Sequence, residues 1–206
     1  MRMHKIRGLY AVTPDIANTA LLCQMVEAAL QGGASVVQYR NKVADKNLQF
    51  TQAKALLKIC QQYQIPLIIN DNLMLAKMIG ADGVHLGASD GEVSVARETL
   101  GADKIIGVSC YNQIALAVSV AEQGASYVAF GACFASNTKP NAPTTSLALF
   151  DEAKQLNIPI VAIGGIDLQN AHLLKAAGAN AIAVVNALFA SKNITQTAIE
   201  FKHLFN

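Results

Sequence analysis

The chain lacks the features that mark several common classes of protein. Its 206 residues include 16 Lys and Arg against 14 Asp and Glu, with no basic block. A nucleic-acid-binding protein clusters its basic residues on one face, so no nucleic-acid partner is predicted. No uncharged apolar run approaches the roughly 18 residues that a membrane-spanning helix needs. The N-terminal residues also lack the apolar core of a signal peptide, so we expect no membrane partner.

Cysteine pairs at metal-binding or redox spacing are absent as well. The four cysteines are widely separated, and no two form a CxxC pair. Neither a zinc knuckle nor a thioredoxin-like motif is therefore supported. Reduced thiols in a cytoplasmic protein are the simpler interpretation.

What the sequence does contain is a series of short apolar runs, within a composition that is 52% hydrophobic. Most runs are rich in Val and Ile and nearly continuous, which is typical of parallel strands covered on both faces. The predicted strands are 9–13, 36–40, 67–70, 83–86, 105–109, 127–131, 160–163 and 181–185. No linker-like or low-complexity stretch interrupts them, so residues 1–206 are expected to form one domain.

A helix-like segment follows each predicted strand. The predicted helices are 19–31, 46–63, 73–79, 92–100, 112–122, 146–156, 168–176 and 195–204. Several end in Gly followed by Ala and a strand, a pattern typical of helix-to-strand turns. Eight such units predict an α/β fold, a closed (β/α)8 TIM barrel. An open doubly wound sheet is the alternative, although no GxGxxG motif follows the first strand.

Polar side chains follow several strands, beginning with Gln38, Arg40 and Lys42 after the second. Side chains two positions apart in a strand share a face, so Gln38 and Arg40 are expected to point the same way. Arg binds two phosphate oxygens at once, and Lys supplies a mobile point charge. This cluster predicts an anion site, and the alternative is a solvated strand exit with surface salt bridges.

Two carboxylates follow the next two strands. Asp71 comes directly after the third strand, and Asp90 lies five residues past His85 of the fourth. Mg²⁺ takes one or two protein carboxylates and completes its shell with water and substrate phosphate, so the pair predicts a magnesium site. A turn position or a helix N-cap is the alternative for both residues. His85 itself lies within an apolar strand, and we expect a hydrogen-bonded structural role for it.

The later strands end in small or neutral residues. Gly164 and Gly165 follow the seventh strand, and Val185 and Asn186 end the eighth. In many barrels these two loops bind a phosphate, so the same is predicted here. The alternative for the glycines is a tight turn. Ser109 ends the fifth strand, where its hydroxyl can donate to a phosphate or simply terminate the strand.

The longest irregular segment covers residues 132–145 and follows the sixth strand. It contains Ser136, Asn137, Thr138 and Lys139, whose hydroxyl, amide and ammonium groups are suited to an anion cradle. A segment of this length in a compact domain is usually functional, and we expect a lid. A proline-shaped loop without a ligand is the alternative.

Taken in order, these motifs resemble the thiamine-phosphate synthase family. The resemblance runs nearly the whole length of the chain. The motifs that carry it are Gln38-Tyr39-Arg40-Asn41-Lys42, Ile69-Asn70-Asp71, Gly83-Val84-His85-Leu86-Gly87 with Asp90, Gly107-Val108-Ser109, Thr138-Lys139 and Ile163-Gly164-Gly165-Ile166.

This resemblance implies a transferase with a (β/α)8 barrel. It would join 4-amino-2-methyl-5-hydroxymethylpyrimidine diphosphate to a thiazole phosphate, typically the carboxylated form. The products would be thiamine phosphate, pyrophosphate and CO₂. Mg²⁺ is the implied cofactor, the implied partners are these small molecules, and a homodimer is possible for such barrels.

It also implies a role for each cluster. The residues that would hold the pyrimidine diphosphate are Gln38, Tyr39, Arg40, Asn41, Lys42, Asn70, Ser109 and Lys139. Those that would hold the thiazole phosphate are Ser136, Asn137, Thr138, Gly165, Val185 and Asn186. Asp71 and Asp90 would hold Mg²⁺. The catalytic roles would belong to Arg40, Lys42, Ser109 and Lys139.

The chain departs from the family pattern at three positions. Ala88 stands where Gln is common, Ala135 where Pro is usual, and Asn186 where Ser is usual. Asn keeps a hydrogen-bond donor beside the thiazole phosphate, whereas Ala88 loses a polar group near the metal.

Three rival functions are open. A thiazole tautomerase of the same fold would have a histidine after the Gly-Val-Ser strand, where this chain has Cys110 and Tyr111. A non-catalytic binding protein would have no need of paired metal carboxylates. A sugar-phosphate epimerase or isomerase would need a pair of proton-transfer groups, and His85 is the single mid-barrel candidate.

Overall fold

The chain forms a closed barrel of eight parallel strands. The structure is a computed structural model that describes residues 6–87, 90–135 and 145–205. Each strand pairs with its neighbour in sequence, and β1 pairs with β8 to close the ring. The strands are β1 Gly8–Val12, β2 Val36–Tyr39, β3 Leu67–Asn70, β4 Gly83–Leu86, β5 Ile105–Tyr111, β6 Tyr127–Phe130, β7 Ile160–Ile163 and β8 Ala181–Val184. This confirms the predicted (β/α)8 barrel and excludes the open sheet.

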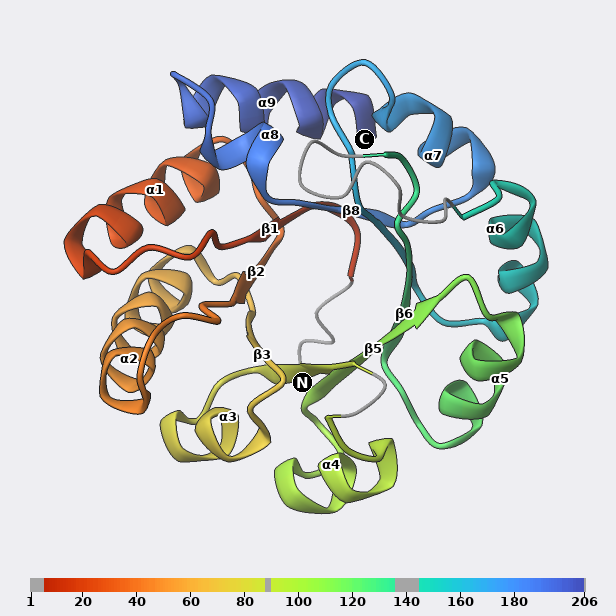
Figure 1. Cartoon of the computed structure of the whole chain (residues 1–206), viewed down its shortest axis with the longest axis horizontal. Coiled ribbons are helices and arrows are strands. Elements are labelled where there is room, and N and C mark those ends of the chain that lie inside the picture. The colour runs from red at the N-terminus through yellow and green to blue at the C-terminus, as the bar shows by residue number, and fades with distance from the viewer. Residues whose placement is uncertain (1–5, 88–89, 136–144, 206) are drawn as a thin grey trace.

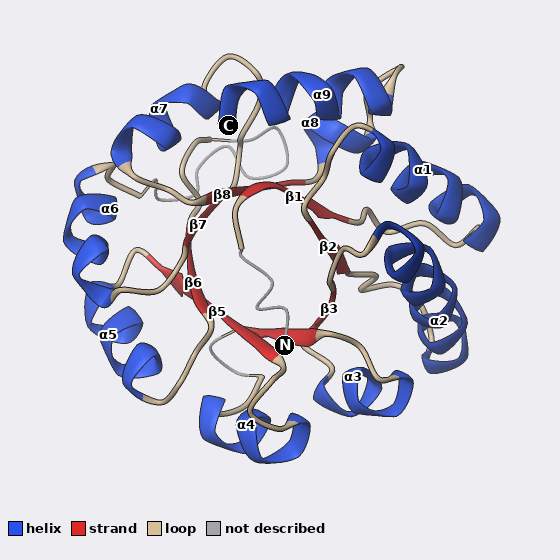
Figure 2. Cartoon of the chain, turned by 180° about the vertical axis from the view of Figure 1, so that it is seen from behind, coloured by secondary structure: helices blue, strands red, loops and turns tan. Residues whose placement is uncertain are grey.

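Helices surround the barrel on the outside, as the two opposite views in Figures 1 and 2 show. They are α1 Thr19–Gln31, α2 Lys46–Tyr63, α3 Leu73–Ile79, α4 Val93–Leu100, α5 Ile114–Glu122, α6 Ala148–Ala153, α7 Ala171–Ala177, α8 Asn186–Phe189 and α9 Ile194–Phe205. None of the helices described here is both long enough and apolar enough to cross a membrane.

The strands are buried on both faces, which explains why their sequences are almost continuously apolar. Along β1, Leu9 packs in the outer layer between sheet and helices, whereas Tyr10 packs in the lumen. Along β3, Ile68 faces the lumen and Ile69 faces the helices. The result is an outer core and a smaller inner core that fills the barrel.

Two boundaries differ from the sequence prediction at places that shape the barrel's open end. The fifth strand continues to Tyr111, past a register shift between Ser109 and Tyr111. Such an irregularity re-aims the side chains around it, which apolar periodicity does not reveal. The short helix α8 was not predicted, because its four residues, starting at Asn186, are too few to show a helical period.

The end of the barrel at which the strands begin is called the N-terminal rim, and the opposite end is called the mouth. At the rim, the glycine after α3, Gly80, has φ +72°, the left-handed geometry predicted for these turns. The residues that directly precede β4, β6 and β8 each cap the start of an earlier strand. Asp82 accepts from Leu67 N at 2.9 Å, Ser126 from Ile106 N at 3.0 Å and Asn180 from Ile160 N at 2.7 Å.

Two basic side chains complete the N-terminal rim. The Arg97 guanidinium donates to the carbonyl oxygens of Gly101, Ala102, Lys104 and Gly124 and to Ser126 Oγ, at 2.6–3.3 Å. Lys104 Nζ donates to Gly80 O and Ala81 O at 3.3 and 2.6 Å. Three successive helix-to-strand turns are therefore joined by side-chain hydrogen bonds.

Candidate active site

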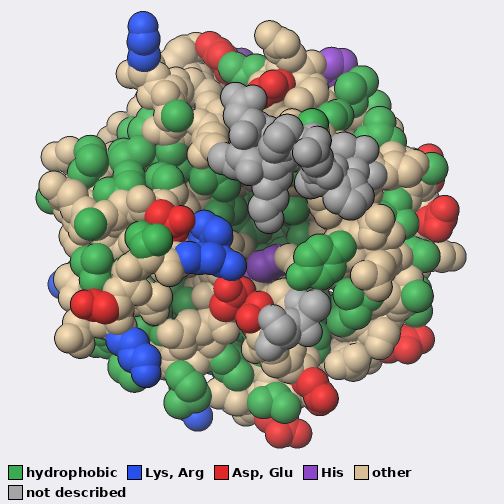
Figure 3. All heavy atoms as spheres, viewed as in Figure 1, with side chains coloured by type: hydrophobic (Ala, Val, Ile, Leu, Met, Phe, Trp, Pro, Cys, Tyr) green, Lys and Arg blue, Asp and Glu red, His purple; other side chains and the backbone are tan. Residues whose placement is uncertain are grey.

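The mouth contains a central cavity of about 330 Å³. Its polar lining comes from the ends of β2, β3, β4 and β5. The side chains involved are Gln38, Arg40, Lys42, Asn70, Asp71, His85, Asp90, Ser109 and Tyr111. Figure 3 shows basic, acidic and histidine side chains gathered beside a hollow at the centre of this face. Polar residues from four of the strand ends singled out in the sequence therefore converge on this cavity.

The β2 end supplies the positive charge. Gln38 and Arg40 both line the central cavity, as strand alternation predicted. Arg40 Nη1 lies 3.4 Å from Asp15 Oδ1, and Lys42 Nζ lies 3.8 Å from Asp71 Oδ2. These contacts are long, and the four side chains stay 32–59% exposed, so both cations remain accessible to an anion.

Tyr39 and Asn41 point the other way. Their side chains are buried and both hydrogen-bond to Gln52 of α2. Together with Lys42 and Asp71 they line a separate cavity of about 490 Å³ beside α2 and α3. The structure thus does not bring these two side chains to the central cavity, because alternate residues of a strand face opposite sides.

The two carboxylates after β3 and β4 lie close together at the mouth. Burial, followed by a hydrogen bond and charge repulsion from Asp90, raises the pKa of Asp71. Asp71 also has a left-handed backbone, φ +60°, an uncommon geometry that Asp tolerates better than most residues. Its N–H donates to His85 O at 2.8 Å.

The alternative that these carboxylates are helix N-caps is wrong. Asn72 caps α3 through its side chain, and α4 begins after Glu92. Asp90 instead accepts from Gly87 N at 2.8 Å. A Cβ on Gly87 would lie 2.5 Å from Asp90 Oδ2, so the glycine leaves room for the carboxylate.

A divalent cation fits this pair. A carboxylate whose proton affinity is raised by a neighbouring carboxylate, as that of Asp71 is, is relieved by a cation between the two. Within the described ranges no group of three or more His, Cys, Asp and Glu side chains could hold a metal. Mg²⁺ needs only one or two protein carboxylates, so Asp71 and Asp90 suit it better than a metal that requires a full protein cage.

A chain of hydrogen bonds crosses the lumen beneath the central cavity. Gln38 Nε2 donates to Tyr10 OH at 2.9 Å, and Tyr10 OH lies 2.8 Å from Tyr127 OH. The His85 ring joins Tyr127 OH and Ser109 Oγ, each at 2.8 Å. Burial lowers the pKa of His85 to about 4, against a weaker opposing effect of Asp90. His85 is therefore neutral and hydrogen-bonded, the structural role expected from sequence.

A second cavity, of about 420 Å³, adjoins the first on the side of β5 to β8. The two share Ser109, Tyr111, Ile163 and Val185. Among the residues that the structure describes, no Lys, Arg, Asp or Glu lines it, and the lining includes Gly131, Ala132, Gly164, Gly165, Ile166 and Asn186. Its polar groups are therefore mostly backbone.

Glycines allow the loops beside this second cavity to approach closely. A Cβ on Gly165 would meet Phe134 O at 2.4 Å, and Gly165 itself has φ +65°. The loop after β6 is tied to the end of β7 through Cys133 N to Ile163 O and Phe134 N to Gly164 O, both at 3.0 Å. Tight packing and a backbone-lined cavity thus have one origin. The tight turn is confirmed, and phosphate binding by these glycines stays a prediction.

Some predicted residues lie outside the described part of the chain. They are Ser136, Asn137, Thr138 and Lys139, together with Ala88 and most of the expected lid. Their predicted roles stay predictions. Ala135 is described, and its carbonyl oxygen would lie 2.7 Å from a Cβ on Gly165.

Sequence reasoning missed four residues that shape the mouth. Tyr10 and Tyr127 lie within apolar strands, where a buried phenol needs a partner for its hydroxyl, and that was the available signal. Asp15 and Gln52 contact the β2 end from other elements. Neither carries a motif, so no signal in the sequence could have found them.

Comparison with known proteins gives one consistent result. Residues 9–188 match the model of the family described as thiamine monophosphate synthase. A thiamine-phosphate synthase of Methylobacillus flagellatus is 54% identical, over 98% of this chain and 96% of its own length. One from Nitrosomonas eutropha is 50% identical, over 98% and 95% respectively.

Solved structures agree. A thiamine phosphate pyrophosphorylase from Pyrococcus furiosus superposes with a TM-score of 0.85 at 28% identity, covering 98% of this chain and 97% of its own. A 3-hexulose-6-phosphate synthase superposes with a TM-score of 0.70 at 13% identity, covering 96% of this chain and 99% of its own, which shows the fold alone.

Proposed function

The chain belongs to the thiamine monophosphate synthase family of transferases, and we propose that its mouth joins a pyrimidine diphosphate to a thiazole phosphate. The activity is that of a thiamine-phosphate synthase. One observation supports the two-substrate assignment most directly. A charged cavity and an uncharged cavity adjoin each other and share Ser109 and Tyr111. Two ligands of different charge distribution can therefore meet at a common wall.

We assign the diphosphate to the charged cavity. When the bond between the pyrimidine methylene carbon and the diphosphate oxygen breaks, the electron pair leaves with the oxygen. Arg40 and Lys42 lie where they can neutralise that charge, and preorganised cations are worth more to the transition state than to the ground state. Lys139, outside the described residues, is proposed to add a third cation.

Mg²⁺ bound between Asp71 and Asp90 would supply further neutralisation of the leaving diphosphate. The fit of these two carboxylates to a hard cation supports this assignment. Asn70 precedes Asp71 and lines the same cavity, so its amide is proposed to orient a phosphate oxygen.

The pyrimidine ring is placed above the lumen chain of hydrogen bonds. Gln38 and Ser109 line the cavity floor, and both are held by that chain, through Tyr10 and His85 respectively. A ring with amine and ring-nitrogen groups needs donors and acceptors fixed in place, which these residues provide.

The thiazole phosphate is assigned to the second cavity. Its phosphate would be held by backbone N–H groups near Gly165, Val185 and Asn186, with Ser136, Asn137 and Thr138 as further predicted contacts. The thiazole nitrogen then attacks the methylene carbon across the shared wall, forming the new C–N bond. Where the carboxylated thiazole is used, the C–C bond to its carboxylate then breaks and CO₂ leaves.

The rival functions fit the mouth less well. A tautomerase acting on the thiazole alone has no use for the charged cavity. An epimerase or isomerase needs a group that titrates near neutral pH, whereas burial lowers the pKa of His85 to about 4.

A coupled assay tests the proposal. Purified protein would be supplied with the pyrimidine diphosphate and the thiazole phosphate, in Mg²⁺ or in EDTA. We expect thiamine phosphate and pyrophosphate in equal amounts, and only with the metal. Folded protein that forms no product with Mg²⁺ would overturn the proposed reaction, and equal rates in EDTA would overturn the metal role.

We also infer a cytoplasmic location, which four free cysteines support. The homodimer expected from sequence stays a prediction that sedimentation of the purified protein would check.

A further inference from the structure

The two cations of the β2 end are only loosely held by their own side-chain contacts. Within the described part of the chain, Arg40 and Lys42 each make one long ion pair, 3.4 and 3.8 Å respectively. A flexible cation contributes little preorganisation to a transition state. The backbone that carries them, in contrast, is held closely. Thr13 Oγ1 accepts from Arg40 N and donates to Arg40 O, both at 2.8 Å.

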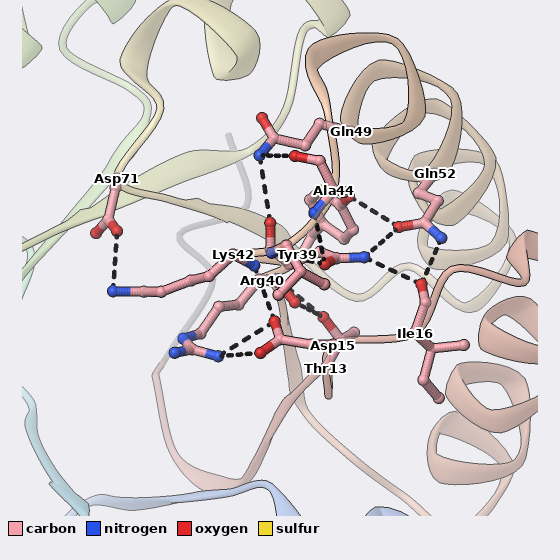
Figure 4. Close-up of polar contacts among 12 residues, drawn as sticks. Thr13, Asp15, Ile16, Tyr39, Arg40, Lys42, Ala44, Gln49, Gln52 and Asp71 are labelled. Atoms are coloured by element: carbon pink, nitrogen blue, oxygen red, sulfur yellow. Dashed lines mark hydrogen bonds and ion pairs between the residues drawn. The ribbon is translucent and has the colours of Figure 1, made fainter.

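The main anchor of this backbone is Gln52, a fully buried glutamine on α2. Its Oε1 accepts from Tyr39 OH at 2.9 Å and from Asn41 Nδ2 at 3.0 Å. Its Nε2 donates to Ile16 O at 2.8 Å and to Ala17 O at 3.3 Å. Figure 4 shows this network beside the cations. Both donor and both acceptor positions of the amide are therefore used.

These contacts hold two chain segments that lie beside the cations. Tyr39 and Asn41 are the two chain neighbours of Arg40. The carbonyls that Gln52 holds directly follow Asp15, whose carboxylate accepts from Lys42 N at 2.8 Å and faces Arg40. The position of one buried amide thus determines the loop that carries the cations and the loop that carries their counter-charge.

We propose that Gln52 is a positioning residue that orients Arg40 and Lys42 toward the diphosphate. It touches no ligand itself and acts through the two loops it joins. The inference rests on the proposed function, because it assumes that these cations bind the diphosphate. A purely structural Gln52 would affect both substrates equally, whereas a positioning residue affects the diphosphate selectively.

The test replaces the amide by an apolar chain of similar length, Gln52→Met. Two quantities are measured: the affinity for pyrophosphate with Mg²⁺ by calorimetry, and the KM for each substrate. We expect pyrophosphate affinity to fall about tenfold and the KM for the pyrimidine diphosphate to rise as much, since displaced binding groups act on this scale. The KM for the thiazole phosphate should change less than about twofold.

Leu56→Val is the matched control. Leu56 is fully buried one turn further along α2, and its side chain is a hydrocarbon that cannot hydrogen-bond to either loop. It should lower the melting temperature without a selective change in either KM. Comparable selectivity in Leu56→Val, or unchanged pyrophosphate affinity in folded Gln52→Met, would overturn the positioning role.

Arg40→Met separates the two levels of inference. If pyrophosphate binding is unaffected by Arg40→Met, the proposed function of the charged cavity fails. If Arg40→Met weakens binding and Gln52→Met does not, only the positioning role fails. If both weaken it, the double variant should lose clearly less than the product of the two single effects, because the substitutions act on one group.

Discussion

The two ends of the barrel use basic side chains in opposite ways. At the N-terminal rim, Arg97 makes five hydrogen bonds to two turns, and Lys104 makes two more to a third. At the mouth, Arg40 and Lys42 each make one long ion pair with a carboxylate. Charge and residue type are the same at both ends, and the number of contacts differs.

This difference shows how to recognise a basic side chain that is available to bind a ligand in such a barrel. A guanidinium whose donors are already satisfied by carbonyl oxygens holds the fold and has nothing left to offer a ligand. A guanidinium with unused donors at the strand ends is available to an anion. Stability and binding are therefore expected to separate between the rim and the mouth, and four substitutions or conditions test that separation.

The largest effect is expected at the mouth, from Asp71→Asn. Removing one of the two proposed metal carboxylates should lower Mg²⁺-dependent turnover by on the order of a thousandfold, because a metal ion held there would supply several kcal/mol of transition-state stabilisation. Asp151→Asn, on exposed α6, is the control and should leave turnover unchanged. Wild-type rates in Asp71→Asn at limiting Mg²⁺ would remove Asp71 from the metal site.

The next effect is expected from Arg40→Met. Loss of one preorganised donor should reduce kcat/KM by about a hundredfold. Stability should change by less than about 0.5 kcal/mol, because the one ion pair that Arg40 makes with a described residue is long and partly exposed. Steady-state rates and urea unfolding measure the two quantities. A large loss of stability with little loss of rate would show that Arg40 stabilises the fold as Arg97 is expected to. The proposed difference between the mouth and the rim would then be wrong.

The matching substitution at the rim, Arg97→Met, should behave in the opposite way. Five acceptors lose their donor, so the free energy of unfolding should fall by about 3 kcal/mol. The folded protein should keep its kcat/KM within about twofold, since the rim lies at the far end of the strands from the chemistry. Lys58→Met, on the exposed side of α2, controls for loss of charge. Unfolding curves with rates measured below the transition distinguish the outcomes.

The smallest effect concerns His85, in the lumen between the two ends. Its pKa is about 4 in the folded chain against 6.5 as the ordinary value. As pH falls from 7 to 5, the unfolded chain binds a proton that the folded chain does not, so stability is lost, by about 2 kcal/mol. Below pH 4 the loss should level off. The melting temperature followed from pH 7 to 5 measures it, with His172→Gln, exposed on α7, as control. A flat profile would contradict the burial of a neutral His85.

Much of this molecule follows from its sequence because apolar periodicity determines the fold. The strands were predicted within about two residues, since parallel strands buried on both faces leave an unmistakable pattern. That the side chains of Gln38 and Arg40 face the same side of β2 also followed from the alternation of residues along a strand. The register shift after Ser109 and the four-residue α8 did not, because neither alters the apolar pattern.

The candidate site was predictable where its residues directly follow strands that end at the mouth. It was hidden where they lie on other elements. Asp71 and Asp90 follow neighbouring strands, so their meeting could be inferred. Gln52 lies on the outer face of the barrel in a helix, and nothing in its neighbours marks it as different from the exposed glutamines of the same helix. Only the three-dimensional contact with the β2 end reveals it.

The two buried phenols in the lumen limit the routes by which ligands can enter and leave the barrel. Tyr10 and Tyr127 are fully buried and block the barrel below the central cavity, so the described structure offers ligands a single doorway at the mouth. Both substrates of the proposed reaction would enter, and both products would leave, through this one opening. Product inhibition can test whether this shared route imposes an order of arrival with the pyrimidine first. Inhibition by thiamine phosphate that is competitive with the pyrimidine diphosphate alone would be its kinetic signature, and a random order would show competition with both.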